Sequence, residues 1–121
     1  MLKGYFAEND GSGILSTADR EGRVNAAIYS KPHIIEEETI ALLMSERLSY
    51  ANLQVNPYAV YLFMETGPGW KGKRIYLKKV KEEHNTDLAK SLIRRTHVDK
   101  ENLDVNLVYF QIEKVLPLIG E

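Results

Sequence analysis

The chain has 121 residues, of which 44% are hydrophobic and 27% are charged, and its formal net charge is -1. A charge so close to zero gives no general attraction to nucleic acid or to anionic lipid. The absence of cysteine excludes disulfides, thiolate metal ligands and cysteine nucleophiles. The length fits a single domain over residues 1–121, in which any redox chemistry must come from a bound cofactor.

No apolar run approaches the roughly 20 residues that a membrane-spanning helix needs. The first six residues, MLKGYF, lack the apolar core of a signal peptide. We therefore expect a cytoplasmic protein with no membrane partner.

The N-terminal third is predicted to form a short helix followed by a β-hairpin. Leu2 and Phe6 lie four residues apart, as on one face of a helix. The run from Asn9 to Gly13 contains two glycines and is predicted to break that helix. The predicted elements are a helix over residues 2–8, strands over 14–18 and 24–30, and a turn over 19–22 between the strands.

The middle of the chain is predicted to be a buried strand that leads into a helix. Residues 39–44 are almost continuously apolar, as in a strand buried on both faces. Residues 45–54 show no strand alternation, so we predict a short helix capped by Ser45 or Ser49. Before the strand we expect an extended segment over 33–35 and a charged turn over 36–38.

The C-terminal half is predicted to hold three strands, a glycine-rich loop and a helix. Six strands and two or three short helices, with no regular βαβ alternation, favour a mainly β, antiparallel barrel over a parallel sheet. The predicted elements are strands over 58–64, 74–81 and 106–115, a loop over 65–72, and a helix over 86–96 capped by Asn85 or Thr86.

The segment from Ser45 to Ser49 is the first candidate site. The start of a helix exposes unpaired N–H groups and a partial positive charge, which suits a phosphate group. Arg47 can add a bidentate positive charge, and the serines can add a hydroxyl group. The same residues also fit a capped helix with a surface arginine, and the local sequence alone favours that interpretation.

The loop Gly67-Pro68-Gly69-Trp70 is the second candidate site. A ring that follows glycine can lie against a flat ligand, because the backbone beside it can approach closely. The alternative is a flexible hairpin loop with a partly packed tryptophan. At eight residues, the whole loop over 65–72 is longer than a hairpin needs.

The basic stretch from Lys71 to Lys81 runs along a predicted strand beside Tyr76. A basic sheet with exposed rings suits single-stranded nucleic acid, whereas lysines on a strand more often form a solvated edge that resists aggregation. We favour the solvated edge. The histidines His33, His84 and His97 lie far apart without the spacing of metal ligands, so no metal site is predicted.

Three segments together resemble the FMN-binding split barrels of the pyridoxamine 5'-phosphate oxidase-like family, and most of all its minimal members of about this length. These segments are GILSTADREGRVNAAIYS, ALLMSERLSYANLQVNPYAVYLF and GPGWKGKRIYLKKVK. The resemblance runs from Gly13 to about Val115. It implies a six-stranded antiparallel split barrel with Greek-key elements, and a homodimer that binds FMN at the subunit interface.

The resemblance also implies which residues bind the cofactor. It places a strand segment along the isoalloxazine ring, an adjacent strand end and turn at the phosphate, and the glycine-rich loop near the flavin, from the partner subunit. The implied residues are Asn25, Ala26, Ala27, Ile28, Tyr29, Ser30, Leu43, Met44, Ser45, Arg47, Leu48, Ser49, Asn52, Gly67, Pro68, Gly69 and Trp70. Many relatives carry a cation directly before the serine or threonine of the turn, whereas here Leu48 precedes Ser49. Lys71, Lys73 or Arg74 is therefore a possible further contributor.

These observations predict an FMN-binding flavoprotein that acts as an electron carrier or a small flavin-dependent oxidoreductase, with a redox partner that the sequence does not specify. The vitamin-oxidising enzymes are longer and carry basic substrate-binding residues that this chain lacks, which argues against pyridoxamine phosphate oxidase activity. No residue is predicted to act as a general acid or base. The alternatives are the same barrel with deazaflavin F420 or haem, or a barrel that binds single-stranded nucleic acid.

Overall fold

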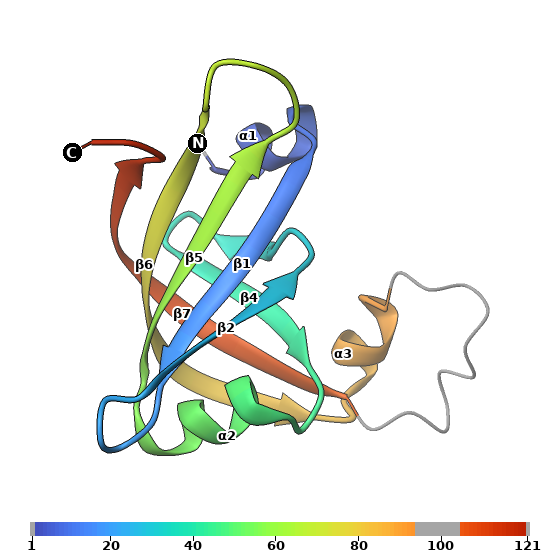
Figure 1. Cartoon of the computed structure of the whole chain (residues 1–121). Helices are drawn as coiled ribbons and strands as arrows, with labels where there is room; N and C mark the ends of the chain where they lie inside the picture. Colours follow the sequence, from blue (N-terminus) through green and yellow to red (C-terminus); the bar gives the residue numbers. More distant parts are fainter. Residues whose placement is uncertain (1, 94–104, 121) are drawn as a thin grey trace.

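The computed structural model describes residues 2–93 and 105–120 (Figure 1). Of the helix predicted over residues 86–96, residues 94–96 lie outside this described part. The elements are α1 (Leu2–Glu8), β1 (Gly11–Ala18), β2 (Val24–Tyr29), β3 (His33–Glu36), β4 (Thr39–Met44), α2 (Leu48–Val55), β5 (Tyr58–Glu65), β6 (Gly72–His84), α3 (Asp87–Ser91) and β7 (Asn106–Pro117).

The strands form one curled antiparallel sheet in the order β2-β1-β5-β6-β7-β4-β3 (Figure 1). Strands β5, β6 and β7 follow one another as neighbours, and β4 pairs with the far side of β7. This arrangement is a Greek key, in which the long connection from β4 to β5 contains α2. The predicted mainly β, antiparallel split barrel is therefore confirmed.

The sheet has seven strands, one more than predicted. The additional strand is β3, which pairs with β4 through His33–Ala41 and Ile34–Ile40. The sequence predicted only an extended segment there, because three apolar or aromatic positions are too few to show strand alternation. Strands β2 and β3 stand at the two ends of the order, so each has one edge that pairs with no strand in the described residues.

Strand β1 begins at Gly11, earlier than predicted, within the glycine run that was expected only to end the first helix. A Cβ atom on Gly13 would overlap the hydroxyl group of Tyr61, and one on Gly11 would overlap the backbone of β5. The Tyr61 hydroxyl donates to the carbonyl groups of Tyr29 and Ser30, at 3.3 and 3.0 Å. These glycines therefore permit close packing inside a strand, and they do not mark a turn.

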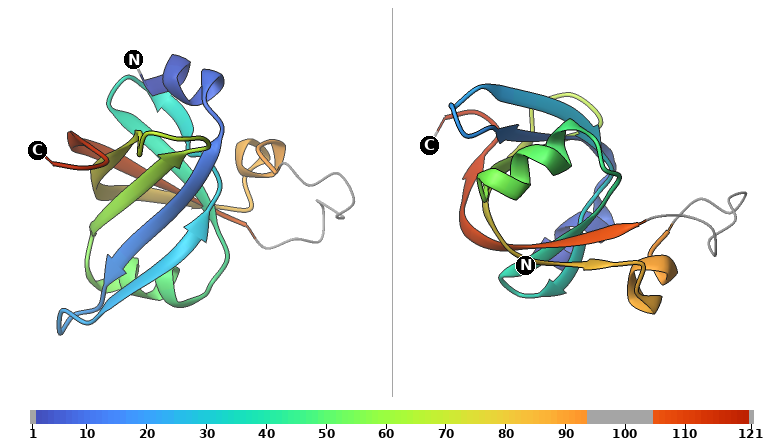
Figure 2. Two further views of the ribbon diagram at one scale, coloured as in Figure 1. Left: turned by 45° about the horizontal axis from the view of Figure 1, so that its top comes forward. Right: turned by 90° about the horizontal axis from the view of Figure 1, so that it is seen from below.

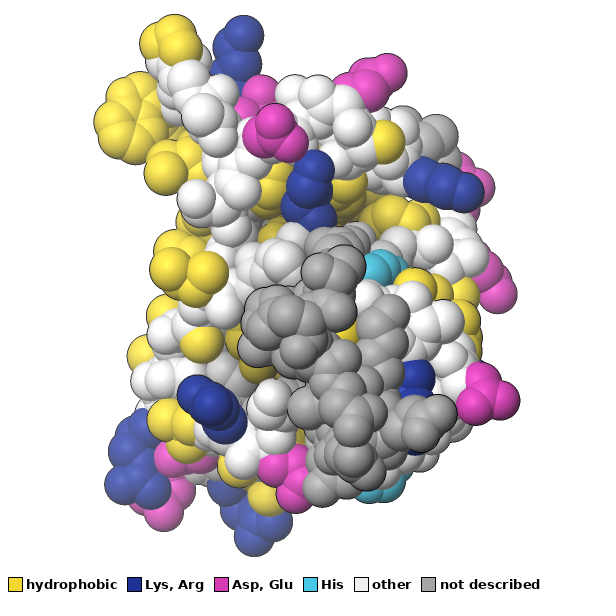
Figure 3. Space-filling view, turned by 90° about the vertical axis from the view of Figure 1, so that its right-hand side faces the viewer, with side chains coloured by type: hydrophobic (Ala, Val, Ile, Leu, Met, Phe, Trp, Pro, Cys, Tyr) yellow, Lys and Arg dark blue, Asp and Glu magenta, His cyan; other side chains and the backbone are white. Residues whose placement is uncertain are grey.

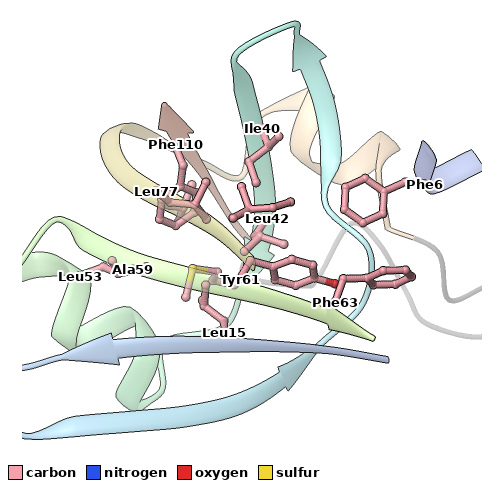
Figure 4. Close-up of a cluster of buried hydrophobic side chains, with 13 residues drawn as sticks. Phe6, Leu15, Ile40, Leu42, Leu53, Ala59, Tyr61, Phe63, Leu77 and Phe110 are labelled. Atoms are coloured by element: carbon pink, nitrogen blue, oxygen red, sulfur yellow. The ribbon is translucent and has the colours of Figure 1, made fainter. Parts of the chain in front are cut away.

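Strand β4 is buried on both faces, as predicted, because the protein has two apolar clusters. Ile40 and Leu42 point into the main core, which α1 covers at one end with Phe6 (Figure 4). Ala41 points the other way, into a smaller cluster beneath α3. The main core comprises Phe6, Leu15, Ile40, Leu42, Met44, Leu53, Ala59, Tyr61, Phe63, Ile75, Leu77, Val108 and Phe110.

The helices are short, and each covers one part of the sheet. Helix α1 lies beside the loop that joins β5 and β6, whereas α2 lies across the opposite end of the barrel (Figures 1 and 2). The predicted cap of α3 is confirmed, since the hydroxyl of Thr86 accepts a hydrogen bond from the N–H of Ala89 at 3.1 Å. In residues 2–93 and 105–120, no helix is long and apolar enough to cross a membrane.

Candidate functional site

The N-terminus of α2 carries no side-chain cap within the described residues. Arg47 occupies the N-cap position with extended backbone and makes no capping hydrogen bond. The prediction of Ser45 or Ser49 as the cap was wrong. The carbonyl of Ser45 instead accepts the N–H of Arg47 at 2.8 Å, and Ser49 lies inside the helix. The first-turn N–H groups therefore have no capping side chain and can receive an external acceptor.

Ser49 is buried against β2, with only 3% of its surface exposed. The Nδ2 of Asn25 donates to the Ser49 hydroxyl at 3.2 Å. Tyr29 lies on the same side of β2, where burial raises the pKa of its hydroxyl against the opposing effects of a hydrogen bond with Ser49 and the charge of Arg47. The structure thus brings together four predicted residues, which we call the α2 cluster: Asn25, Tyr29, Arg47 and Ser49.

Two predicted residues near this cluster have structural roles. Asn52 is buried and donates to the Thr17 hydroxyl at 3.0 Å, which ties α2 to β1. The side chain of Met44 belongs to the main core, and its carbonyl accepts from Nδ2 of Asn106 at 3.2 Å. Met44 can therefore border a ligand at most through its backbone, and Asn52 acts on the position of the helix.

The predicted segment of β2 is divided between two faces. Asn25, Ala27 and Tyr29 are half-buried on the side of α2, whereas Ala26 and Ile28 are exposed on the other side. A strand alternates in this way by geometry, so six consecutive side chains cannot share one ligand face. The unpaired edge of β2 lies between the two faces and offers backbone donors and acceptors along its length. Ser30 directly follows β2, and Ser45 lies between β4 and α2. Leu43 packs against the smaller apolar cluster, and Leu48 is exposed as the first residue of α2.

The glycine-rich loop lies at the opposite end of the barrel from α2 (Figure 1). Strand β5 separates them, and its eight residues span about 25 Å. Gly67 and Gly69 have φ angles of 113° and 98°, and Trp70 has a φ of 51°. This backbone holds the Trp70 side chain outward with 69% of its surface exposed.

A cavity of about 540 Å³ opens beside this loop, between Trp70, Met64 and Ser12. The start of the loop, at Glu65, is anchored by Tyr5, a residue that the sequence did not single out. The Tyr5 hydroxyl donates to Oε2 of Glu65 at 2.6 Å, and burial together with that carboxylate raises the pKa of Tyr5. The loop is therefore anchored at its base while its tip is exposed.

The three further cations proposed for a phosphate also lie at the loop end. The Nζ of Lys73 stands 4.7 Å from the ring centroid of Tyr5. The guanidinium of Arg74 donates to the carbonyl of Pro117 at 2.9 Å and to that of Gly120. Lys71 is exposed within the loop itself. None of these three lies near the α2 cluster of the same chain.

The outer face of β1, β2 and β5 is apolar and exposed. Cross-strand pairing aligns Ile28, Ile14 and Leu62 in one row, and 82% of the Ile28 surface is exposed. Val24, also 82% exposed, and Met64 extend this outer face. In Figure 3, hydrophobic side chains lie along the left margin, which is the side that faces the viewer in Figure 1. On β7, by contrast, Leu107 and Tyr109 are covered within the chain, because they pack in one cluster with Ala89 of α3.

Lysine ammonium groups cover the ring faces of two tyrosines on or beside the basic strand. The ammonium of Lys114 lies 4.5 Å from the centroid of the Tyr76 ring, and that of Lys78 lies 5.8 Å from the centroid of Tyr58. A ring face covered by a cation is not available for stacking on a base. This geometry favours the solvated edge over a surface for nucleic acid.

No protein-family model and no curated protein matches the chain. Among solved structures, the chain is similar to an FMN-binding protein from Syntrophomonas wolfei subsp. wolfei. The two share 26% sequence identity with a TM-score of 0.78, over 96% of this chain and 82% of the other. It is also similar to a candidate pyridoxamine 5'-phosphate oxidase from Lactobacillus delbrueckii, with 17% identity and a TM-score of 0.71 over 93% and 88% of the two chains.

A third similar structure is a haem storage protein from Vibrio cholerae, with 20% identity and a TM-score of 0.65 over 95% and 90% of the two chains. The fold described above and these neighbours define a split-barrel protein. These neighbours support the resemblance of the chain to the pyridoxamine 5'-phosphate oxidase-like split barrels.

Proposed function

We propose that the chain is a flavoprotein that binds FMN, with the phosphate at the N-terminus of α2. The observation that carries this proposal is the uncapped first turn of α2 beside Arg47 and the hydroxyl of Ser49. Free N–H groups, a guanidinium and a hydroxyl are the donors that a phosphate dianion requires. The residues present therefore fit the group. The FMN-binding neighbour from Syntrophomonas wolfei supports the same choice of ligand.

The isoalloxazine ring has a matching place along the free edge of β2. Backbone N–H and C=O groups at an unpaired edge can bond the polar rim of a flat heterocycle. Ala27 lies between Asn25 and Tyr29 on the α2 side and is small enough to let a ring approach. The flavin supplies the redox chemistry when bound, and the chain's own residues bind it and exclude water from one face.

We infer that the site is completed by a second copy of the chain. The exposed row of Ile28, Ile14 and Leu62 is an apolar surface of the kind that marks an interface. Trp70 and α2 lie at opposite ends of β5, whose eight residues span about 25 Å, so Trp70 is assigned to the flavin of the partner chain. The proposed assembly is a homodimer with one FMN at each of two interface sites.

This architecture supports the role of an electron carrier or a small flavin-dependent oxidoreductase. A flavin held at the N-terminus of a helix and at an open strand edge remains reachable by a redox partner. Within the α2 cluster, burial raises the pKa of the Tyr29 hydroxyl. The four residues of the cluster are therefore assigned to binding and orienting the flavin, and the flavin supplies the redox chemistry.

The visible spectrum of the purified protein tests the proposal. We expect flavin absorbance, or saturable binding when FMN is added to the apoprotein, with a Kd in the micromolar range or tighter. A colourless protein that does not bind FMN below millimolar concentration would contradict it. Mass spectrometry of the extracted ligand separates FMN from the alternatives, deazaflavin F420 and haem.

A further inference from the structure

Helix α2 is too short to hold its own position. Isolated helices below about 12–15 residues are marginal in water, and α2 has 8. Its place across the end of the barrel (Figure 2) therefore depends on contacts with the strands. On one side these contacts are the hydrogen bonds from Asn25 of β2 to Ser49 and from Asn52 to Thr17 of β1.

On its other side α2 is held by one carboxylate, that of Glu82 in β6. The hydroxyl of Tyr50 donates to Oε1 at 2.9 Å, and Nε2 of Gln54 donates to Oε2 at 3.2 Å. The Nζ of Lys79 lies 3.2 Å from the same Oε2. Tyr50 and Gln54 are four residues apart and share one helix face. Glu82 therefore ties successive turns of α2 to β6, and we call this set the Glu82 clasp.

Glu82 reaches α2 because β6 carries a β-bulge at Val80. The pairing of β6 with β7 shifts by one residue just after Lys79. In a regular strand, residues three apart point to opposite faces. The extra residue reverses this alternation, so Lys79 and Glu82 lie on the same side. Glu82 pairs with Val108, a residue of the main core, which places the carboxylate on the inner side of the sheet, where α2 lies.

The charge of Glu82 is stabilised by its partners. Burial acts to raise the pKa of this carboxyl group, but the hydrogen bonds from Tyr50 and Gln54 and the ammonium of Lys79 outweigh it and hold the pKa below its ordinary value. Conversely, burial and the bond to Glu82 raise the pKa of Tyr50 to about 12. At neutral pH a charged acceptor thus faces neutral and positive donors, which makes each bond strong and directional.

We propose that Glu82 is a positioning residue for the phosphate site. The Glu82 clasp fixes the orientation of α2 about its own axis. It thereby sets the direction in which the first-turn N–H groups and the Arg47 side chain point toward the phosphate. Tyr50 is the third residue of the helix, so the clasp acts on the same turn that carries the donors. This inference rests on the proposed function and adds to it the element that sets the geometry of the site.

The test compares FMN with riboflavin, which has the same ring without the phosphate. We expect Glu82→Ala to weaken FMN binding about tenfold and riboflavin binding less than about twofold. Tyr50→Phe removes one of the three bonds, and we expect it to weaken FMN binding about threefold. The ³¹P resonance of bound FMN should shift in both variants. If Glu82→Ala does not fold, Glu82→Gln keeps the shape and one carbonyl acceptor, and the same ratio is measured on it.

Glu83→Gln is the matched control, because Glu83 is the next carboxylate of β6 but faces α3, where it accepts from the Thr86 hydroxyl at 3.1 Å. This variant loses comparable contacts and should leave the FMN-to-riboflavin ratio unchanged. An unchanged ratio in the folded Glu82 variants, while the wild type binds FMN, overturns the positioning role alone. A wild-type protein that binds neither flavin overturns the proposed function, and the positioning role falls with it.

Discussion

The two ends of the barrel that carry the candidate residues are built in opposite ways. At the α2 end, Ser49 and Asn52 are buried and hydrogen-bonded to neighbouring strands. At the loop end, Trp70 is mostly exposed on a backbone with positive φ angles, and only the base of the loop is anchored, through Tyr5. Contacts within the chain therefore hold the side chains at the α2 end in place. At the loop tip, the backbone positions Trp70, but no other part of the described chain covers its ring.

This difference indicates how the two regions divide the proposed task. A preorganised set of donors can bind a phosphate without a large entropic cost. An exposed ring at the tip of a loop contributes to binding only when something covers it. We therefore expect substitutions at the α2 end to alter the affinity for phosphate, and substitutions at the loop end to act through the assembly of two chains.

The largest effect is expected from Ile28→Asp on the outer face. A carboxylate in the centre of an apolar interface is costly to desolvate, so the dimer should dissociate and FMN affinity should fall by about 100-fold or more. Sedimentation velocity and FMN titration at micromolar protein check this. Leu88→Asp on the exposed side of α3 is the control. A dimer that persists in Ile28→Asp would show that the outer face of β2 is not the interface.

Arg47→Ala should have the next largest effect. Loss of a charge-assisted contact of about 1.5–3 kcal/mol weakens FMN binding roughly 10- to 100-fold. Riboflavin affinity should stay unchanged, because riboflavin has no phosphate. Isothermal titration with both ligands measures the two values, with Arg20→Ala in the exposed β1–β2 turn as the control. Equal losses of affinity for FMN and riboflavin would show that Arg47 does not bind the phosphate.

Trp70→Ala should weaken FMN and riboflavin equally, by roughly 3- to 10-fold, since stacking of an aromatic ring contributes about 0.5–1.5 kcal/mol. Trp70→Phe keeps a ring and should recover most of the affinity. Quenching of the Trp70 fluorescence on flavin binding is a second measurement, and it is simple to interpret because the chain has one tryptophan. If neither the Trp70 fluorescence nor the flavin affinity changes, the loop does not contact the flavin.

The smallest effect is a pH dependence of stability at the α2 end. The pKa of Glu82 is lower in the folded protein, so its contribution is complete above the unfolded value of about 4.3 and is lost as pH falls through the folded value. Urea unfolding midpoints should fall below about pH 4.5 in the wild type, and less steeply in Glu82→Gln. Identical slopes for the two proteins would show that the clasp does not contribute.

Most of the fold could be predicted because each strand carries its own apolar pattern. The hairpin of β1 and β2 and the two-faced burial of β4 follow from local sequence. The contacts between strands were harder to predict from the sequence. Gly11 and Gly13 look like a turn, and only the positions of Tyr61 and the β5 backbone show why a strand needs them. The bulge at Val80 has no local signature either.

The candidate site could be predicted only as two separate pieces. The resemblance selected the four residues of the α2 cluster and the Trp70 loop, and the structure brings those four together at one end of the barrel. The error over the cap of α2 has a physical cause, since a serine before a helix and a serine in its first turn look alike in sequence. Glu82 was not selected, because its link to Tyr50 spans 32 positions of the chain.

The contact between Gly13 and Tyr61 has a consequence for how this protein can evolve. The phenol hydroxyl occupies the space that a methyl group on residue 13 would fill, and it links the end of β2 to the core through two carbonyl groups. Neither position is free to change alone. Homologues with a residue larger than glycine at position 13 should therefore lack the tyrosine hydroxyl at position 61. In an alignment, positions 13 and 61 should covary.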